Sequence, residues 1–131
     1  MSLRFWITAV AVLASCQAMA ETLPSTAKKA TVDELRALSD KKKVAVEIFD
    51  LGTPVRGNLI WNWQKKAITG TAVINNKDKI RVRSILTTSG EKVCATNKGE
   101  KPSCHAVYID GSKFYEVNDD GSVHAVSEVE G

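Results

Sequence analysis

Histidine is the side chain best suited to acid–base catalysis and metal binding near neutral pH, and the chain has only two, His105 and His124. Neither stands in a recognised catalytic or zinc-binding spacing. A metal site could recruit both histidines with Asp119 and Asp120, but nothing in the spacing requires these groups to converge, and two surface or half-buried histidines are the simpler interpretation. The sequence around Ser89 does not form the G-x-S-x-G elbow of a serine nucleophile, and a hairpin turn explains the presence of Ser89 and Gly90 there. The sequence therefore predicts no enzyme, no catalytic residue, no cofactor and no metal.

Cysteine chemistry is the second possibility. Of three cysteines, Cys94 and Cys104 lie in the part that we expect to fold. A loop of residues 97–101 between strand-like flanks would place the two opposite each other on antiparallel strands, where disulfide geometry needs no backbone distortion. His105 would then point to the other face of its strand. The spacing is not C-x-x-C and no second cysteine pair offers a metal site, so we predict a disulfide.

The N-terminal segment 1–20 resembles an export signal. Its apolar run, residues 5–14, is far shorter than the ~20 residues of a membrane-spanning helix. The small residues Ala18 and Ala20 on either side of Met19 form the small-x-small pattern of a signal-peptidase site and predict cleavage before Glu21. Alternatively, residues 13–16 match a lipobox, and Cys16 would be lipidated and anchored in the membrane. Either route predicts a periplasmic or secreted protein, or an outer-membrane lipoprotein.

The remaining chain predicts one short helix followed by strands. Residues 21–30 form a polar lead-in that we expect to be flexible or draped on the surface, and residues 31–131 form a single β-rich domain. Thr31 and Glu34 match a capping box, which predicts a helix of about two turns. From Lys43 onward apolar side chains alternate with polar ones, and turn signals divide the chain into about eight strands. The predicted fold class is all-β, a single antiparallel meander curled into a small barrel or sandwich.

Two tryptophans could bind a ligand. Trp61 and Trp63 share one face of their strand with Leu59. They fill a core in one interpretation. In the other, they line a hollow barrel or an open groove that accepts an apolar, lipid or sugar-like ligand, with the indole N–H groups as donors. Strand parity does not distinguish a filled interior from a hollow one.

Composition indicates an ordinary folded domain. The chain has 131 residues, 44% hydrophobic and 25% charged, with a net charge of +3, which is too mild to indicate a nucleic-acid binder. Residues 41–101 contain 13 Lys or Arg against 5 Asp or Glu. Arg81 and Arg83 share one sheet face in this basic region. They form either a patch for an anionic envelope ligand or acidic partner, or a solvated face that protects the sheet.

Two resemblances add to these patterns. The opening at residues 21–24, the segment 31–38 and the strand-rich body with its cysteine pair resemble small exported alphaproteobacterial domains of unknown function, which typically carry a cleaved signal, an "LP…ELRAL" opening and a β-rich core. This resemblance implies cleavage after Ala20 and no catalytic residue. A second resemblance is to periplasmic lysozyme inhibitors, exported disulfide-bearing barrels whose enzyme-blocking loop uses a Ser-Gly pair. Ser89 and Gly90 would stand in that place.

We therefore expect a non-enzymatic cell-envelope protein that binds an envelope partner or an anionic or apolar ligand. The contact would involve Trp61 and Trp63, or Arg81 and Arg83, and a membrane would be met only through a lipid anchor. The alternative is an inhibitor or immunity protein against an extracellular enzyme such as lysozyme, with Ser89 in a protruding loop.

Overall fold

The computed structural model describes residues 21–131. The predicted signal, its cleavage site and the lipidation site Cys16 lie outside the described residues. The elements in chain order are β1 (Lys28–Lys29), α2 (Val32–Ser39), β2 (Lys43–Ile48), β3 (Val55–Asn62), β4 (Ala67–Ile74), β5 (Asp78–Ser89), β6 (Lys92–Thr96), β7 (Ser103–Asp110), β8 (Lys113–Val117) and β9 (Val123–Val129). No helix within residues 21–131 is long and apolar enough to cross a membrane.

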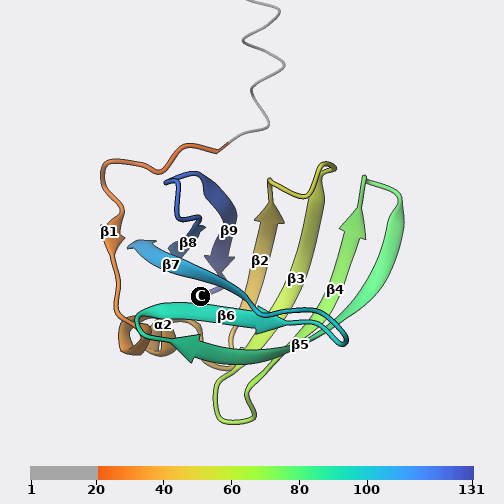
Figure 1. Ribbon diagram of the computed structural model, residues 1–131, viewed down its shortest axis with the longest axis horizontal. Coiled ribbons are helices and arrows are strands. Elements are labelled where there is room, and N and C mark those ends of the chain that lie inside the picture. The colour runs from red at the N-terminus through yellow and green to blue at the C-terminus, as the bar shows by residue number, and fades with distance from the viewer. Residues whose placement is uncertain (1–20) are drawn as a thin grey trace, which may run out of the picture.

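Strands β2 to β9 form a closed eight-stranded antiparallel barrel (Figure 1). Each strand pairs with its neighbour in sequence, and β2 pairs with β9 to close the ring. The predicted all-β meander is confirmed, and of the two predicted architectures the chain adopts the barrel. Closure removes most of the unpaired strand edges that an open sheet would expose.

The turns follow from residues that tolerate a left-handed backbone. Between β4 and β5, Asn75 and Asn76 have φ values of 55° and 57°, and positive φ at both central residues defines the type I′ turn that suits the twist of a hairpin. The two Asp-Gly turns place Gly111 at φ 62° and Gly121 at φ 89°. The turn signals in the sequence therefore set the strand boundaries.

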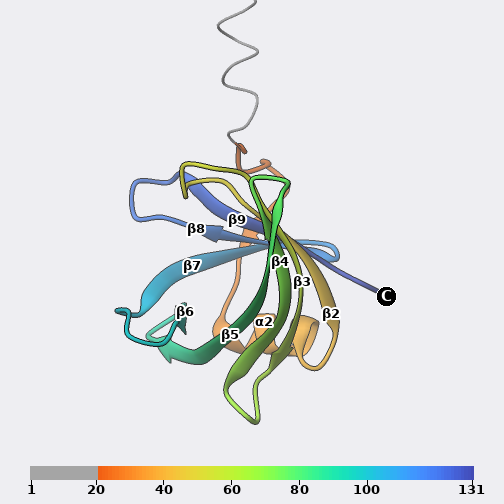
Figure 2. The same ribbon diagram turned by 90° about the vertical axis from the view of Figure 1, so that its right-hand side faces the viewer.

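Helix α2 closes one end of the barrel (Figure 2). It begins with the predicted capping box, in which the Thr31 hydroxyl accepts from the Glu34 amide and the Glu34 carboxylate accepts from the Thr31 amide. Leu35 and Ser39 of this helix are fully buried. The Ser39 hydroxyl accepts a 2.9 Å hydrogen bond from Trp63 Nε1. Apolar packing and a side-chain hydrogen bond therefore both hold the helix against the barrel.

The lead-in 21–30 is draped along the outside of the barrel. Its strand β1 pairs with β7 where β6 has ended, and Ala30 donates a 2.9 Å backbone hydrogen bond to Val107. Leu23 and Ala27 pack against an outward-facing apolar cluster on β8 and β9 that includes Tyr115. This segment therefore covers apolar surface that the barrel strands would otherwise expose to water.

Candidate functional site: a half-hollow barrel with a histidine cluster

The end of the barrel near α2 is packed solid. Trp61 meets Phe114 edge to face, with ring centroids 5.3 Å apart, and lies 6.0 Å from Trp63. Leu35 from α2 and Leu86 from β5 complete this core, and both are almost fully buried. Offset and edge-to-face aromatic pairs are the favoured packing geometries. The interior at this end is therefore filled by packed side chains.

The opposite end of the barrel contains a cavity of about 480 Å³. Its wall is largely apolar, with lining residues that include Val46, Ile48, Val55, Leu59, Ile68, Ile74 and Val82, and Trp61 forms part of its floor. The cavity exists because small side chains take several inward positions: Ala72, Ala95 and Ala125 line it. Gly70 stands opposite Leu59 and Val82 in register, so the barrel wall contributes no side chain there.

The cavity opens beside the first half of β5. Strand β5 pairs with β6 only from residue 85 onward, and among the described residues its segment 78–84 pairs with β4 alone. The loop between β6 and β7 covers part of this edge, where Ser84 Oγ donates a 2.5 Å hydrogen bond to Asn97 Oδ1. Two apolar side chains among the lining residues are largely exposed, Leu51 at 56% and Ile80 at 43%. The entrance is therefore apolar as well as accessible.

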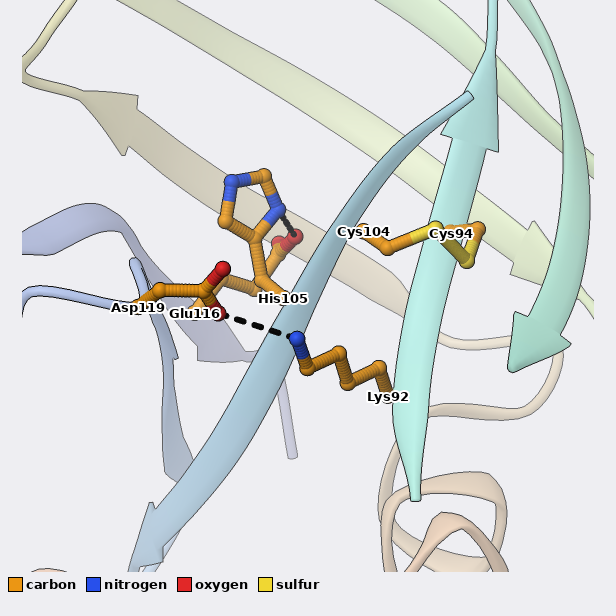
Figure 3. The surroundings of a disulfide bond; sticks show 6 residues. All are labelled: Lys92, Cys94, Cys104, His105, Glu116 and Asp119. Carbon is orange, nitrogen blue, oxygen red and sulfur yellow. Dashed lines mark hydrogen bonds and ion pairs between the residues drawn. A yellow bond between two sulfur atoms is a disulfide. The ribbon is translucent and has the colours of Figure 1, made fainter. Parts of the chain in front are cut away.

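Three titratable side chains meet inside the cavity: His105 from β7, Glu116 from β8 and His124 from β9. The two imidazole rings stack in parallel, 4.1 Å between centroids, and His105 Nδ1 lies 3.7 Å from Glu116 Oε2. Figure 3 shows His105 and Glu116 on one side of β7 and the Cys94–Cys104 disulfide on the other. The predicted disulfide and the predicted opposite orientation of His105 are both confirmed.

A β-bulge brings His124 into this cluster. Glu116 pairs with Ala125, but the next residue, Val117, pairs with Val123. His124 is thus an extra residue between two pairs, and a bulge of this kind redirects a side chain that regular alternation would send to the other face. The bulge explains why His124 lines the same cavity as its neighbour Ala125.

Asp50, in the loop after β2, fixes the orientation of His124. Its Oδ1 lies 2.6 Å from His124 Nδ1, and its Oδ2 accepts a 3.0 Å hydrogen bond from Asn118 Nδ2. This chain of contacts ties the β2–β3 loop to the β8–β9 turn. It also leaves His124 Nε2 as the ring nitrogen not engaged by Asp50.

Burial shifts the protonation of His105 and Glu116 toward their neutral forms. Removal from water lowers the pKa of His105, and repulsion from His124 lowers it further. Burial raises the pKa of Glu116, opposed by the attraction of His124. His105 is only 7% exposed and, within residues 21–131, its Nδ1 has no hydrogen-bond partner. A buried imidazole with a free nitrogen is costly unless something binds it.

The tryptophans predicted as contact residues are interior, with Trp61 3% and Trp63 9% exposed. A surface contact through them is therefore excluded, because neither ring reaches the outside. Trp63 has its N–H satisfied by Ser39. Trp61 Nε1 is buried and finds no hydrogen-bond partner among the described residues. The Trp61 ring belongs to the packed core and also lines the cavity.

The other predicted residues lie elsewhere. Arg81 and Arg83 are exposed on β5 and are among the residues lining the cavity entrance. Ser89 pairs with Lys92 across a two-residue turn, and within that turn Glu91 accepts a 3.2 Å hydrogen bond from the start of α2. This is a short turn held against the helix and not a protruding loop.

The acidic residues that sequence spacing offered to a metal site are not part of the cluster. Asp119 is 89% exposed and pairs with Lys92 at 2.9 Å, and Asp120 accepts from Ser122. The structure places Glu116 and Asp50 near the histidines instead. Regular alternation along β8 places Glu116 on the same face as buried Phe114, so its inward position could have been predicted from the sequence. The proximity of Asp50 to the histidines depends on the fold and could not.

Information on function comes from the cavity and its side chains. Comparison of the chain with protein-family models, with curated proteins and with solved structures finds no match. What the protein does is therefore inferred from the chemistry of its own residues.

Proposed function

We propose that this chain is a non-enzymatic, exported binding module whose half-hollow barrel holds one small, largely apolar ligand. The observation that carries the proposal is the cavity of about 480 Å³ at the end of the barrel opposite α2. Ligand pockets commonly span roughly 300–1,000 Å³, and a barrel of about eight strands is just wide enough to hold one small ligand. The cavity therefore suits one molecule of modest size.

The lining indicates the kind of ligand. Most wall residues are aliphatic, and transfer of apolar ligand surface from water to such a wall is favourable by roughly 25 cal/mol per Å². At the floor, Trp61 adds its ring to this apolar surface, while its N–H is buried out of contact with the cavity. This lining suits a ligand with a compact apolar body.

The location outside the cytoplasm has separate support. Disulfides such as Cys94–Cys104 persist mainly in oxidising compartments. The resemblance of residues 1–20 to an export signal points the same way. An exported protein with an apolar cavity is suited to carrying or sequestering a poorly soluble small molecule in the cell envelope.

The proposal is tested with N-phenyl-1-naphthylamine, an uncharged apolar dye whose fluorescence rises in apolar surroundings. We expect saturable binding of one dye per chain to the purified protein. Ala72, which is 5% exposed and lines the cavity, should be replaced by phenylalanine. Ala72→Phe places a ring in the cavity and should reduce dye binding at least 10-fold.

The matched control is Thr71→Phe, which puts the same ring on the next residue of β4 but on its exposed, outward face. This variant should bind the dye as the wild type does. Equal loss in both variants, or wild-type binding that does not saturate, would show that the dye binds the outer surface and would refute the proposed cavity.

A further inference from the structure

The ligand proposed above does not explain the group of His105, Glu116 and His124. Each offers one nitrogen or oxygen donor atom, and these atoms all lie within 4.8 Å of one another. Two imidazoles and one carboxylate are a common ligand set for zinc and other first-row divalent metals. The three side chains come from three adjacent strands, so a rigid part of the barrel positions them.

The spacing of the donor atoms is close to what a metal ion requires. Where three donor atoms lie within 4.8 Å of one another, an ion can be placed no more than about 2.8 Å from each of them, and zinc–ligand bonds are roughly 2.0–2.2 Å long. Each donor therefore has to move by less than about 1 Å to bind one ion. Side-chain rotation alone supplies such a movement.

One ring must turn when the ion binds. An imidazole binds a metal in its own ring plane, and two rings stacked at 4.1 Å with an interplanar angle of 5° cannot both aim at one point. His124 is held by Asp50, whereas no hydrogen bond within residues 21–131 holds His105 Nδ1. His105 is therefore the ring that turns, and it has the adjoining cavity to turn into.

The surroundings also match those of a metal site. Metal-binding histidines usually donate their second ring N–H to a carboxylate, which fixes the ring and strengthens the ligand. Asp50 is such a carboxylate for His124, because its Oδ1 lies 2.6 Å from His124 Nδ1. Asn118 in turn donates a hydrogen bond to Asp50 Oδ2.

We propose that His105, Glu116 and His124 bind one divalent transition-metal ion, zinc in the simplest case, at the inner wall of the cavity. Because these three donors come from the protein, a fourth coordination position is left on the cavity side. The site is independent of the apolar ligand: zinc binding is measured with the dye absent, and dye binding with zinc removed by a chelator. Failure of one proposal is thus distinguishable from failure of the other.

The test is a competition titration of zinc between the full-length protein and a chromophoric chelator. We expect one zinc ion per wild-type chain. Glu116→Gln and His124→Ala should each remove measurable binding at the same protein concentration. Asp50→Asn should weaken it by roughly 10–100-fold, the usual effect of losing a carboxylate behind a metal-binding histidine.

The matched control is Asp119→Asn, since this carboxylate is exposed, pairs with Lys92 and is not one of the three donor groups. It should bind zinc as tightly as the wild type. Glu116→Gln keeps the shape of the side chain and removes a buried carboxyl group, so it should fold, and near-ultraviolet circular dichroism of the buried tryptophans verifies this. Cobalt provides a second readout, because its visible absorption should require both histidines and Glu116. Absence of zinc binding in the wild type, or binding that survives Glu116→Gln and His124→Ala in folded protein, would overturn the site.

Discussion

The Cys94–Cys104 disulfide yields a prediction whose size follows from the structure. The bond closes a loop between residues ten apart in sequence and joins directly opposed positions of β6 and β7. Reduction by dithiothreitol breaks it while leaving both sulfur atoms in place, so the packing around buried Cys94 changes little. We expect the reduced protein to remain folded but to be less stable.

The expected loss comes from the freedom that the unfolded chain regains. For a loop of ten residues, the chain-entropy relation gives about 2.7 kcal/mol at 25 °C. A domain of this size has a typical stability of about 5–15 kcal/mol, which is why the barrel should survive reduction. The melting temperature should fall by roughly 10 °C, at about 4 °C per kcal/mol.

The assay is urea unfolding, followed by tryptophan fluorescence, with and without dithiothreitol. The control is the double variant Cys94→Ala/Cys104→Ala, whose stability should not respond to the reductant. A loss below about 1 kcal/mol in the wild type would contradict the reasoning, as would free thiols at both positions in protein recovered from the cell envelope.

Three further predictions concern the helix and the barrel wall. Thr31→Ala should destabilise the protein by about 1 kcal/mol through loss of the helix cap. Hydrogen bonds from Thr31, chiefly from its backbone N–H, hold the pKa of Glu34 below its ordinary value of 4.5, so the stability that the Glu34 carboxylate adds is full above that pH and is lost as the pH falls through the lowered pKa. In urea unfolding, Glu34→Gln should therefore destabilise the protein less at pH 3 than at pH 7. Gly70→Ala should prevent folding, because the added Cβ would overlap the Asn58 carbonyl and Leu59 Cα across the sheet. The control is Gly90→Ala: Gly90 lies in open space at φ +61°, so this substitution should cost about 1–2 kcal/mol and leave the circular dichroism spectrum normal. Leu35→Ala should cost about 2–5 kcal/mol in the same unfolding assay, and a cost near zero would show that α2 does not close the barrel.

Much of the fold could be predicted from local patterns in the sequence. Strand alternation from Lys43 onward, the turn signals and the capping box at Thr31 depend on neighbouring residues, and the structure has each of them. The choice between barrel and sandwich could not be predicted, because it depends on pairing between β2 and β9. The paired residues, such as Val44 and Val129, are far apart in sequence, and no local pattern reports their contact.

The candidate site could be predicted only in part. The inward alanines and glycines, such as Ala72 and Gly70, could have indicated a hollow interior once strand parity was assigned. The position of His124 could not be predicted, since a bulge after Glu116 reverses the face that regular alternation gives it. A bulge depends on the competition between strand pairings and leaves no short sequence signature here.

A crystal structure with N-phenyl-1-naphthylamine bound tests the central claim most directly, that the end of the barrel opposite α2 is a ligand-binding cavity. We predict one dye molecule inside the barrel, in contact with Trp61 and with the aliphatic wall that includes Ile68 and Val82. A barrel whose side chains have collapsed to fill this space, with the dye absent or bound to the outer surface, would contradict the account.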